Sequence, residues 1–188
     1  MKSLSEIYAD YSFEEGYGDK GTLHSYIEIY ENLFSQYRAS AKSVLEIGIG
    51  SKDAYSLKMW RDFFCQAQIY GFDIDSELVI DHGDRITCYQ GDQMNPLDLI
   101  DLPLKEGFDI VIDDGSHIPE HQIGTCAYLW PYVKSQGVYV IEDVANIDFL
   151  GIYFQQLKNM PKVQSYEVVD LRDQKNRFDD ILIVLRKE

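Results

Sequence analysis

The sequence lacks a long hydrophobic run. No apolar stretch approaches the roughly 18–20 residues that a membrane-spanning helix needs. Residues 1–6 also lack the apolar stretch of a signal peptide. These two absences predict a cytoplasmic protein that has no membrane partner.

Cysteine is scarce as well. The chain has three cysteines, Cys65, Cys88 and Cys126, with no CxxC spacing among them. Disulfide frameworks and thiolate metal sites both require paired or closely spaced cysteines. We therefore expect reduced, structural thiols and no soft-metal site.

Basic residues are few beside the acidic ones. The chain carries 17 Lys and Arg against 32 Asp and Glu, a net charge of −15, and has no basic run. Nucleic-acid binding depends on clustered Lys and Arg that neutralise phosphates. The composition therefore argues against a nucleic-acid partner, although acidity alone does not identify a substrate.

What the chain does contain is an alternation of short apolar and longer amphipathic segments. Its 188 residues, 45% of them hydrophobic, suit one domain with a sizeable core. Strands are predicted over 43–47, 68–72, 85–90, 108–112 and 137–141, and helices over 22–38, 53–64, 118–134 and 148–159, with a short helix at 77–82. Two further strands, 165–170 and 180–185, are joined by a polar turn that is too short for a helix.

This order predicts an α/β fold with a seven-stranded, mostly parallel sheet and helices on both faces. The two closing strands should form an antiparallel hairpin at one edge of the sheet. We expect a single domain over 22–188. Residues 1–21 contain several glycines and are predicted to form a mobile segment or lid.

Glycine or an acidic residue follows each of the first five predicted strands. In open α/β sheets, ligands bind beyond the carboxyl ends of the strands. The acidic side chains should therefore converge on one rim of the sheet, and we expect the functional site there.

The first strand runs into Gly48-Ile49-Gly50, and glycines let a backbone approach a ligand closely. Asp73 ends the second strand, where a carboxylate can accept hydrogen bonds from ribose hydroxyls. A dinucleotide fingerprint would need a third glycine at the position of Asp53, which does not suit a pyrophosphate. S-adenosylmethionine (SAM) has no phosphate, and an acidic pocket suits its sulfonium and amino groups. The pattern favours SAM over NAD.

Four more acidic or amide side chains are predicted to bind this cofactor. Glu46 is placed at the methionine part, Asp92 and Gln93 at the adenine amine, and Asp113 elsewhere on the cofactor. An N-cap of a helix beginning near Met94 is the alternative role for Asp92.

Three carboxylates, Asp114, Glu142 and Asp143, follow adjacent strands. Such groups repel one another, and a divalent cation relieves the repulsion. Oxygen ligands point to a hard metal such as Mg²⁺, with Mn²⁺ as a substitute. Capping of the helices that follow is the alternative.

His117 lies three residues after Asp114 and is the candidate general base. An unperturbed histidine has a pKa near 6.5, which suits proton transfer near neutral pH. A surface or capping role is the alternative, and His121 and His24 are rival bases. The neighbouring Ser116 lacks the GxSxG setting of a hydrolase nucleophile.

Several segments together resemble the metal-dependent sugar O-methyltransferases of macrolide and polyketide glycoside biosynthesis, and the cephalosporin-hydroxylase-like methyltransferases share part of the pattern. The matching runs are GDKGTLHSY at 18–26, LEIGIG at 45–50, SLKMWRDFF at 56–64, GFDID at 71–75, IDDGSH at 112–117, VIED at 140–143 and RFDD at 177–180. The resemblance implies a Rossmann-like class I methyltransferase fold. It also implies SAM as cofactor, a metal on Asp114, Glu142 and Asp143, and His117 as general base.

The resulting expectation is a SAM-dependent, metal-assisted O-methyltransferase. By resemblance, its acceptor is a hydroxyl of a sugar or a glycosylated small molecule. A catechol-like or other small hydroxylated metabolite is the alternative acceptor, and a non-catalytic SAM-binding domain is the alternative function. The sequence leaves the acceptor and the oligomeric state open, a homo-oligomer included.

Overall fold

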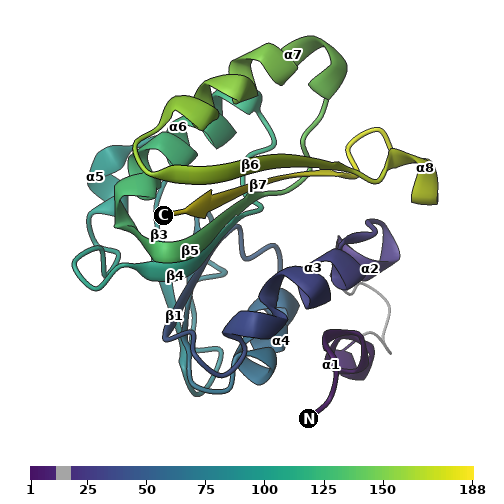
Figure 1. Ribbon diagram of the computed structural model, residues 1–188. Coiled ribbons are helices and arrows are strands. Elements are labelled where there is room, and N and C mark those ends of the chain that lie inside the picture. The colour runs from purple at the N-terminus through teal and green to yellow at the C-terminus, as the bar shows by residue number, and fades with distance from the viewer. Residues whose placement is uncertain (12–17) are drawn as a thin grey trace.

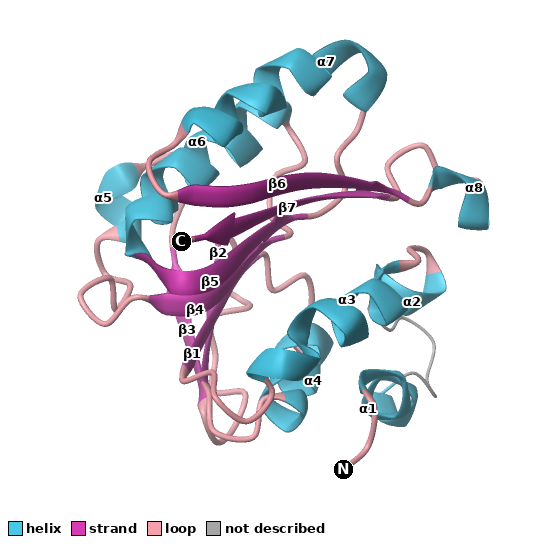
Figure 2. Ribbon diagram, in the orientation of Figure 1, coloured by secondary structure: helices cyan, strands magenta, loops and turns pink. Residues whose placement is uncertain are grey.

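A computed structural model describes residues 1–11 and 18–188. Seven strands form one sheet in the order β3-β2-β1-β4-β5-β7-β6 (Figures 1 and 2). The strands are β1 (Ser43–Ile47), β2 (Gln68–Asp73), β3 (Ile86–Gln90), β4 (Phe108–Asp113), β5 (Val133–Ile141), β6 (Val163–Asp170) and β7 (Ile181–Lys187). The first five run parallel, and β7 pairs antiparallel with β5 and β6. The predicted sheet and its closing hairpin are confirmed.

Helices cover both faces of the sheet (Figure 2). One layer contains α1 (Leu4–Tyr11), α3 (Tyr26–Phe34) and α4 (Tyr55–Phe63), and the other contains α5 (Pro96–Leu99), α6 (Pro119–Leu129) and α7 (Ile147–Phe154). The central strand β1 is buried along its whole length. A strand that is covered on both faces needs apolar residues at nearly every position, which explains the continuous hydrophobic runs in the sequence.

Several predicted helices end earlier than expected. The helix predicted over 22–38 is divided into α2 (Asp19–Thr22), α3 and a 3₁₀ turn, η1 (Ser35–Tyr37). Likewise, α6 and α7 pass into 3₁₀ turns, η2 (Trp130–Tyr132) and η3 (Gln155–Asn159). The break before α3 is stabilised by Lys175, whose ammonium group donates to the carbonyls of Gly21, Thr22 and His24.

Two local predictions need correction. Residues 77–82 form no helix, because the amides of Leu78 and Val79 bond to Asp75 and Ser76 in successive tight turns. The connection between β6 and β7 contains a short helix, α8 (Arg172–Lys175), where a simple turn was predicted.

The segment before α3 packs on the domain. Leu4 and Ile7 of α1 are buried, and the Tyr8 hydroxyl donates to the Gly18 carbonyl at 2.6 Å. The lid prediction for 1–21 stays a prediction, and residues 12–17 lie outside the described part. Within the described ranges, no helix combines the length and apolar character needed to cross a bilayer. All three cysteines are free, as expected.

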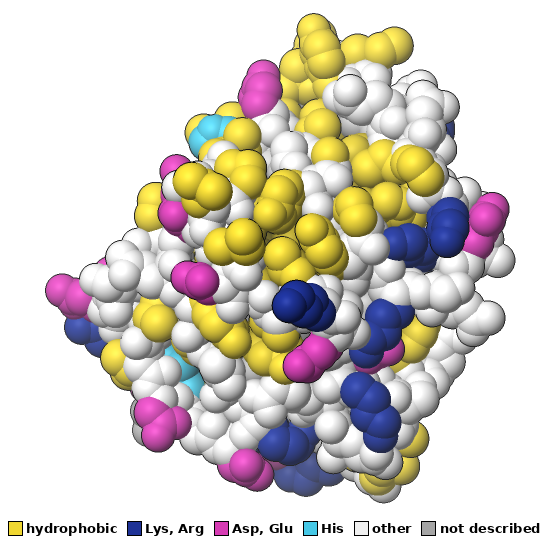
Figure 3. Space-filling model, turned by 90° about the vertical axis from the view of Figure 1, so that its left-hand side faces the viewer, with side chains coloured by type: hydrophobic (Ala, Val, Ile, Leu, Met, Phe, Trp, Pro, Cys, Tyr) yellow, Lys and Arg dark blue, Asp and Glu magenta, His cyan; other side chains and the backbone are white. Residues whose placement is uncertain are grey.

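The outer surface of the α5–α7 layer carries apolar side chains. Leu97 of α5 and Phe149 and Ile152 of α7 are among the exposed large hydrophobic residues. Figure 3 shows one face of the molecule, on which apolar side chains gather in the upper half and charged side chains of both signs are scattered below.

Gly48 fixes the turn that follows β1. Its φ is +90°, and a β-carbon there would lie 2.1 Å from the backbone oxygen of Asp114. Gly50 also has a positive φ, +72°, but no heavy atom lies within 4 Å of the position of its missing β-carbon. The first glycine is therefore required by packing and by backbone conformation, and the second by conformation alone.

This difference gives a matched pair of substitutions. Gly48→Ala should lower the free energy of unfolding by more than about 3 kcal/mol, because the turn or the loop after β4 must move. Gly50→Ala should cost about 1–2 kcal/mol, the cost of a left-handed L-residue. Chemical denaturation of the two variants measures both values, and equal losses would contradict this account of the turn.

Candidate active site

Alternate residues of a strand face the same side of the sheet, and this determines which acidic side chains lie together. Side chains alternate between the two faces of a sheet. Val44 packs in the core under α3 and α4, whereas Leu45 and Ile47 pack in the core under α6. Glu46 therefore lies on the α4 side of β1, where it meets Ser56 and Trp60. Asp114 and Glu142, just beyond β4 and β5, reach the same surface.

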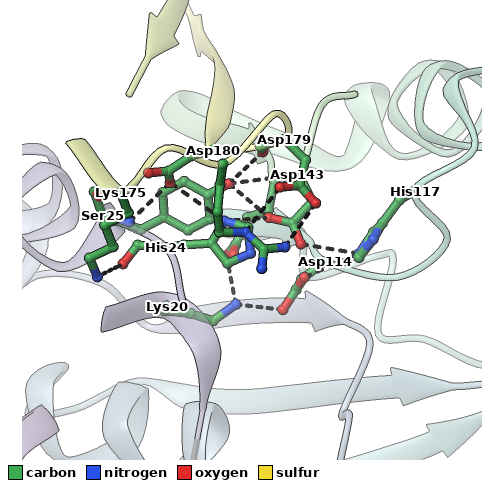
Figure 4. Close-up of polar contacts among 12 residues, drawn as sticks. Lys20, His24, Ser25, Asp114, His117, Asp143, Lys175, Asp179 and Asp180 are labelled. Carbon is green, nitrogen blue, oxygen red and sulfur yellow. Dashed lines mark hydrogen bonds and ion pairs between the residues drawn. The ribbon is translucent and has the colours of Figure 1, made fainter. Parts of the chain in front are cut away.

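Lys20 of α2 binds all three of these carboxylates. Its Nζ lies 2.6 Å from Asp114 Oδ2, 2.7 Å from Glu142 Oε1 and 3.2 Å from Glu46 Oε1. The lysine is 2% exposed. Figure 4 shows it reaching from the N-terminal segment towards Asp114. The acids thus form a buried cluster around one cation.

Burial controls the electrostatics of this cluster. It raises the pKa of Glu46 and, with the neighbouring Asp114, holds the pKa of Glu142 well above its usual range. Burial acts in the same direction on Asp114, but Lys20 and His117 outweigh it and lower the pKa of that carboxyl. The Tyr30 hydroxyl donates to Glu142 Oε1 at 2.6 Å. The cluster is therefore short of positive charge, the condition under which carboxylates bind a cation.

His117 stands at the more exposed side of the cluster. Its Nε2 lies 3.6 Å from both Asp114 Oδ1 and Asp143 Oδ2, and its side chain is 46% exposed. The interaction with Asp114 raises the pKa of His117 more than burial lowers it, and Asp143 adds to the rise. An accessible imidazole beside two carboxylates can exchange protons with a molecule bound there.

The predicted metal residues fall into three overlapping groups, one of which is Asp19, His24 and Asp143. Oxygen and nitrogen atoms of Asp114, His117 and Asp143 lie within 4.8 Å of one another, and so do those of Glu46, Asp114 and Glu142. Asp114 belongs to both of the latter groups, using Oδ1 for one and Oδ2 for the other. Asp114 thus shares one group with Glu142 and another with Asp143, no group among the described residues contains all three predicted ligands, and their metal role stays a prediction.

A cavity of about 510 Å³ adjoins the cluster. It lies between the glycine turn and the N-terminal helices, and its lining includes Gly50, Tyr8, Asp114 and His117. Gly48 and Asp73 lie behind this wall. Asp73 Oδ2 accepts hydrogen bonds from the amides of Ile49 at 2.7 Å and Gly50 at 3.4 Å. Asp73 therefore holds the turn that shapes the cavity.

Of the seven predicted cofactor residues, Gly50 lines this cavity, and six lie outside the lining: Glu46, Gly48, Asp73, Asp92, Gln93 and Asp113. Asp92 Oδ1 accepts from the Met94 amide, and α5 is capped by Asn95, so the N-cap alternative for Asp92 is wrong. Gln93 binds Asp113, Thr125 and the Ser116 amide.

Asp113 points to the other side of the sheet from Asp114. It also accepts from Tyr139, and burial raises its pKa to about 7. Its contacts, like those of Gln93, are with the protein. The cofactor roles of Asp92, Gln93 and Asp113 stay predictions.

The rival histidines have other partners. His121 Nδ1 lies 2.9 Å from Ser116 Oγ. His24 is buried, stacks on Tyr26, and has Nδ1 3.3 Å from Asp143 Oδ1 and 3.4 Å from Asp180 Oδ1. Neither is part of the cavity wall that contains His117.

Sequence reasoning missed Lys20, which it quoted within a motif and gave no role. It also gave no role to the tyrosines of α3, although the Tyr26 hydroxyl donates to Asp143 at 2.7 Å and that of Tyr30 to Glu142. The available signal for Lys20 was its place in the run GDKGTLHSY at 18–26, which the sequence analysis quoted.

Comparison with known proteins gives relatives at two levels. No family model matches the chain. Demethylmacrocin O-methyltransferase of Streptomyces fradiae is 44% identical over 130 residues, which cover 66% of this chain and 33% of the relative. Mycinamicin VI 2''-O-methyltransferase of Micromonospora griseorubida is 43% identical over 130 residues, 66% of this chain and 32% of the relative. The chain therefore spans about a third of the length of these relatives.

A solved structure extends the similarity to the whole chain. The MycE methyltransferase of the mycinamycin biosynthetic pathway, in complex with Mg, SAH and mycinamycin VI, superposes with a TM-score of 0.77 at 30% identity. The match covers 99% of this chain and 54% of the MycE chain. The predicted methyltransferase fold is confirmed.

The raised pKa of His117 can be tested directly. The ring should titrate above 6.5 in NMR spectra of the protein, and Asp114→Asn should lower that pKa because the largest cause is removed. The proton-accepting neutral form is then lost as pH falls through the raised value. Asp148→Asn, which removes an exposed acid paired with Arg172, is the control and should leave the titration unchanged. If the pKa of His117 were unchanged in Asp114→Asn, a group other than Asp114 would be the cause of the shift.

Proposed function

Because the chain is a homologue of the sugar O-methyltransferases of macrolide and tetracenomycin glycoside biosynthesis, we propose that it transfers a methyl group from SAM to a hydroxyl of a sugar or glycosylated small molecule. One observation carries the proposal beyond homology. The cavity bounded by the glycine turn is also lined by Asp114 and His117. A cofactor in that cavity would therefore lie next to the groups that handle the acceptor.

The cavity suits SAM better than a dinucleotide. Its rim is acidic, which favours a sulfonium and an ammonium group and disfavours a pyrophosphate. Asp73 Oδ2 accepts from the amides of Ile49 and Gly50 at the glycine turn, whereas Oδ1 accepts from the Asp75 amide and retains a lone pair for a ribose hydroxyl. Lys20 lines the cavity, and Glu46, buried behind it, lies 3.2 Å from its ammonium group.

The residues of the cluster fit a hard divalent cation. Asp114, Glu142 and Asp143 offer carboxylate oxygens, the ligands that Mg²⁺ and Mn²⁺ prefer. When bound, such an ion lowers the pKa of an acceptor hydroxyl and fixes its orientation.

His117 is placed to take the hydroxyl proton. As that proton moves to the imidazole, the acceptor oxygen forms a bond to the methyl carbon of SAM and the bond from this carbon to sulfur breaks. The remaining contribution is positioning, because the two substrates are held with oxygen, carbon and sulfur in line. Asp114 and Asp143 stabilise the imidazolium that results.

Transfer of a labelled methyl group from SAM tests the proposal. Sugar glycosides should become labelled at oxygen, chelation should abolish the transfer, and added Mg²⁺ should restore it. His117→Ala should lower turnover by about 10²–10⁴-fold, the range for a lost general base, and keep SAM and metal binding. His121→Ala is the matched control and should stay near the wild-type rate. Full turnover in chelator would remove the metal from the reaction, and labelling of catechols alone would change the acceptor class.

Cofactor choice has a separate test. Calorimetry should detect binding of SAM and none of NAD. Asp73→Ala should weaken the binding of SAM by about 1–3 kcal/mol, the scale of a charge-assisted hydrogen bond. Asp75→Ala, two residues away at an exposed turn, is the control and should leave affinity unchanged. Tight NAD binding without SAM binding would refute the proposed activity.

A further inference from the structure

Lys20 is held in place almost entirely by the acidic cluster. An ammonium group has three N–H donors, and here it has three carboxylate partners, Glu46, Asp114 and Glu142. Burial of the amine opposes its charge, but the carboxylates, Asp114 first, outweigh it and keep the pKa of Lys20 well above its usual range. The lysine is therefore a fixed positive charge inside the site.

The oxygens that bind Lys20 belong to residues that a metal would use. Asp114 Oδ2 and Glu142 Oε1 lie 2.6 Å and 2.7 Å from Nζ. A divalent ion bound through these oxygens would stand within a few ångströms of the ammonium group. Two cations so close in a buried setting repel strongly. Glu46, the third partner, lies 3.2 Å from the ammonium group and is not one of the predicted metal ligands.

The segment that carries Lys20 has a second anchor of a different kind. Lys175, in α8, donates to the backbone carbonyls of Gly21, Thr22 and His24. This contact involves no carboxylate of the cluster. The segment is thus held by two sets of contacts: Lys20 with the carboxylates, and its backbone carbonyls with Lys175.

We propose that Lys20 is a built-in competitor of the metal, so that divalent-ion binding at Asp114 and Glu142 weakens the anchorage of α2. The inference rests on the proposed function in one respect, the presence of a metal at these carboxylates. It adds that metal binding and the packing of α2 against the cavity oppose each other, so that each weakens the other. The cavity wall formed by Lys20 and its neighbours in α2 would loosen as the ion binds.

Metal titration of four proteins tests the competition. Mg²⁺ and Mn²⁺ are titrated calorimetrically, without SAM, into the wild type, Lys20→Met, Lys20→Arg and Lys175→Met. Lys20→Met should bind the ions about tenfold or more tightly, because the competing charge is gone. Lys20→Arg keeps the charge and should stay near the wild type. Lys175→Met loosens the same segment without touching the cluster and, because such coupling is reciprocal, should raise metal affinity less than Lys20→Met does.

Hydrogen exchange of the wild type supplies a readout that needs no variant. The amides of Leu23 and His24, which bond to the Asp19 carbonyl at the end of α2, should exchange faster when Mg²⁺ is added. In Lys20→Met, the same amides should be insensitive to the ion. This measurement decides the question even if Lys20→Met does not fold.

The outcomes separate the inference from the proposed function. Equal metal affinity in wild type and Lys20→Met, weaker binding in Lys20→Met, or slower exchange of the wild type with Mg²⁺ would each overturn the competition and leave the metal site in place. Binding of no ion by any of the four proteins would overturn both.

Discussion

The structure depends on one electrostatic constraint, the placing of two buried carboxylates and a third, partly buried one on one face of a mostly parallel sheet. Glu46, Asp114 and Glu142 are brought together by strand order, since β1, β4 and β5 are neighbours. Buried like charges are tolerated only with a compensating cation and hydrogen bonds to their free lone pairs. Lys20 provides the charge, and Ser56, Trp60 and Tyr30 provide the bonds. The ion pairs of Lys20 therefore hold α2 against the domain.

The alternation of side chains along a strand gives neighbouring acids different environments. Asp113 and Asp114 are adjacent in sequence, yet the first meets Tyr139 under α6 and the second meets Lys20. Burial without a cation raises the pKa of Asp113 to about 7, whereas the cation lowers that of Asp114. Two adjacent acids of the motif therefore have pKa values shifted in opposite directions.

Much of this arrangement could be predicted from the sequence, for physical reasons that are local. Runs such as 43–47 are apolar because the sheet is covered on both faces, and the acids follow strand ends, so the rim and its candidate residues were identified. The contacts of Lys20 could not be predicted, because its partners Asp114 and Glu142 lie 94 and 122 residues away in the chain. The break after α2 could not be predicted either, since it is stabilised by Lys175, which is distant in the sequence and donates to the Gly21 carbonyl. The contact of Gln93 with Thr125 could not be predicted either, because the two residues lie 32 positions apart in the chain.

The aromatic helix α3 shows why core and site cannot be assigned separately. The rings of Tyr26 and Tyr30 pack in the hydrophobic layer, and both residues are fully buried. Their hydroxyls nevertheless emerge at the acidic cluster, on Asp143 and Glu142. Burial and the adjacent carboxylates raise the pKa of each tyrosine, so both remain protonated donors. A helical stripe of aromatic residues thus fills the core and also orients two carboxylates of the site, and the packing of α3 sets the geometry in which those carboxylates meet a cation.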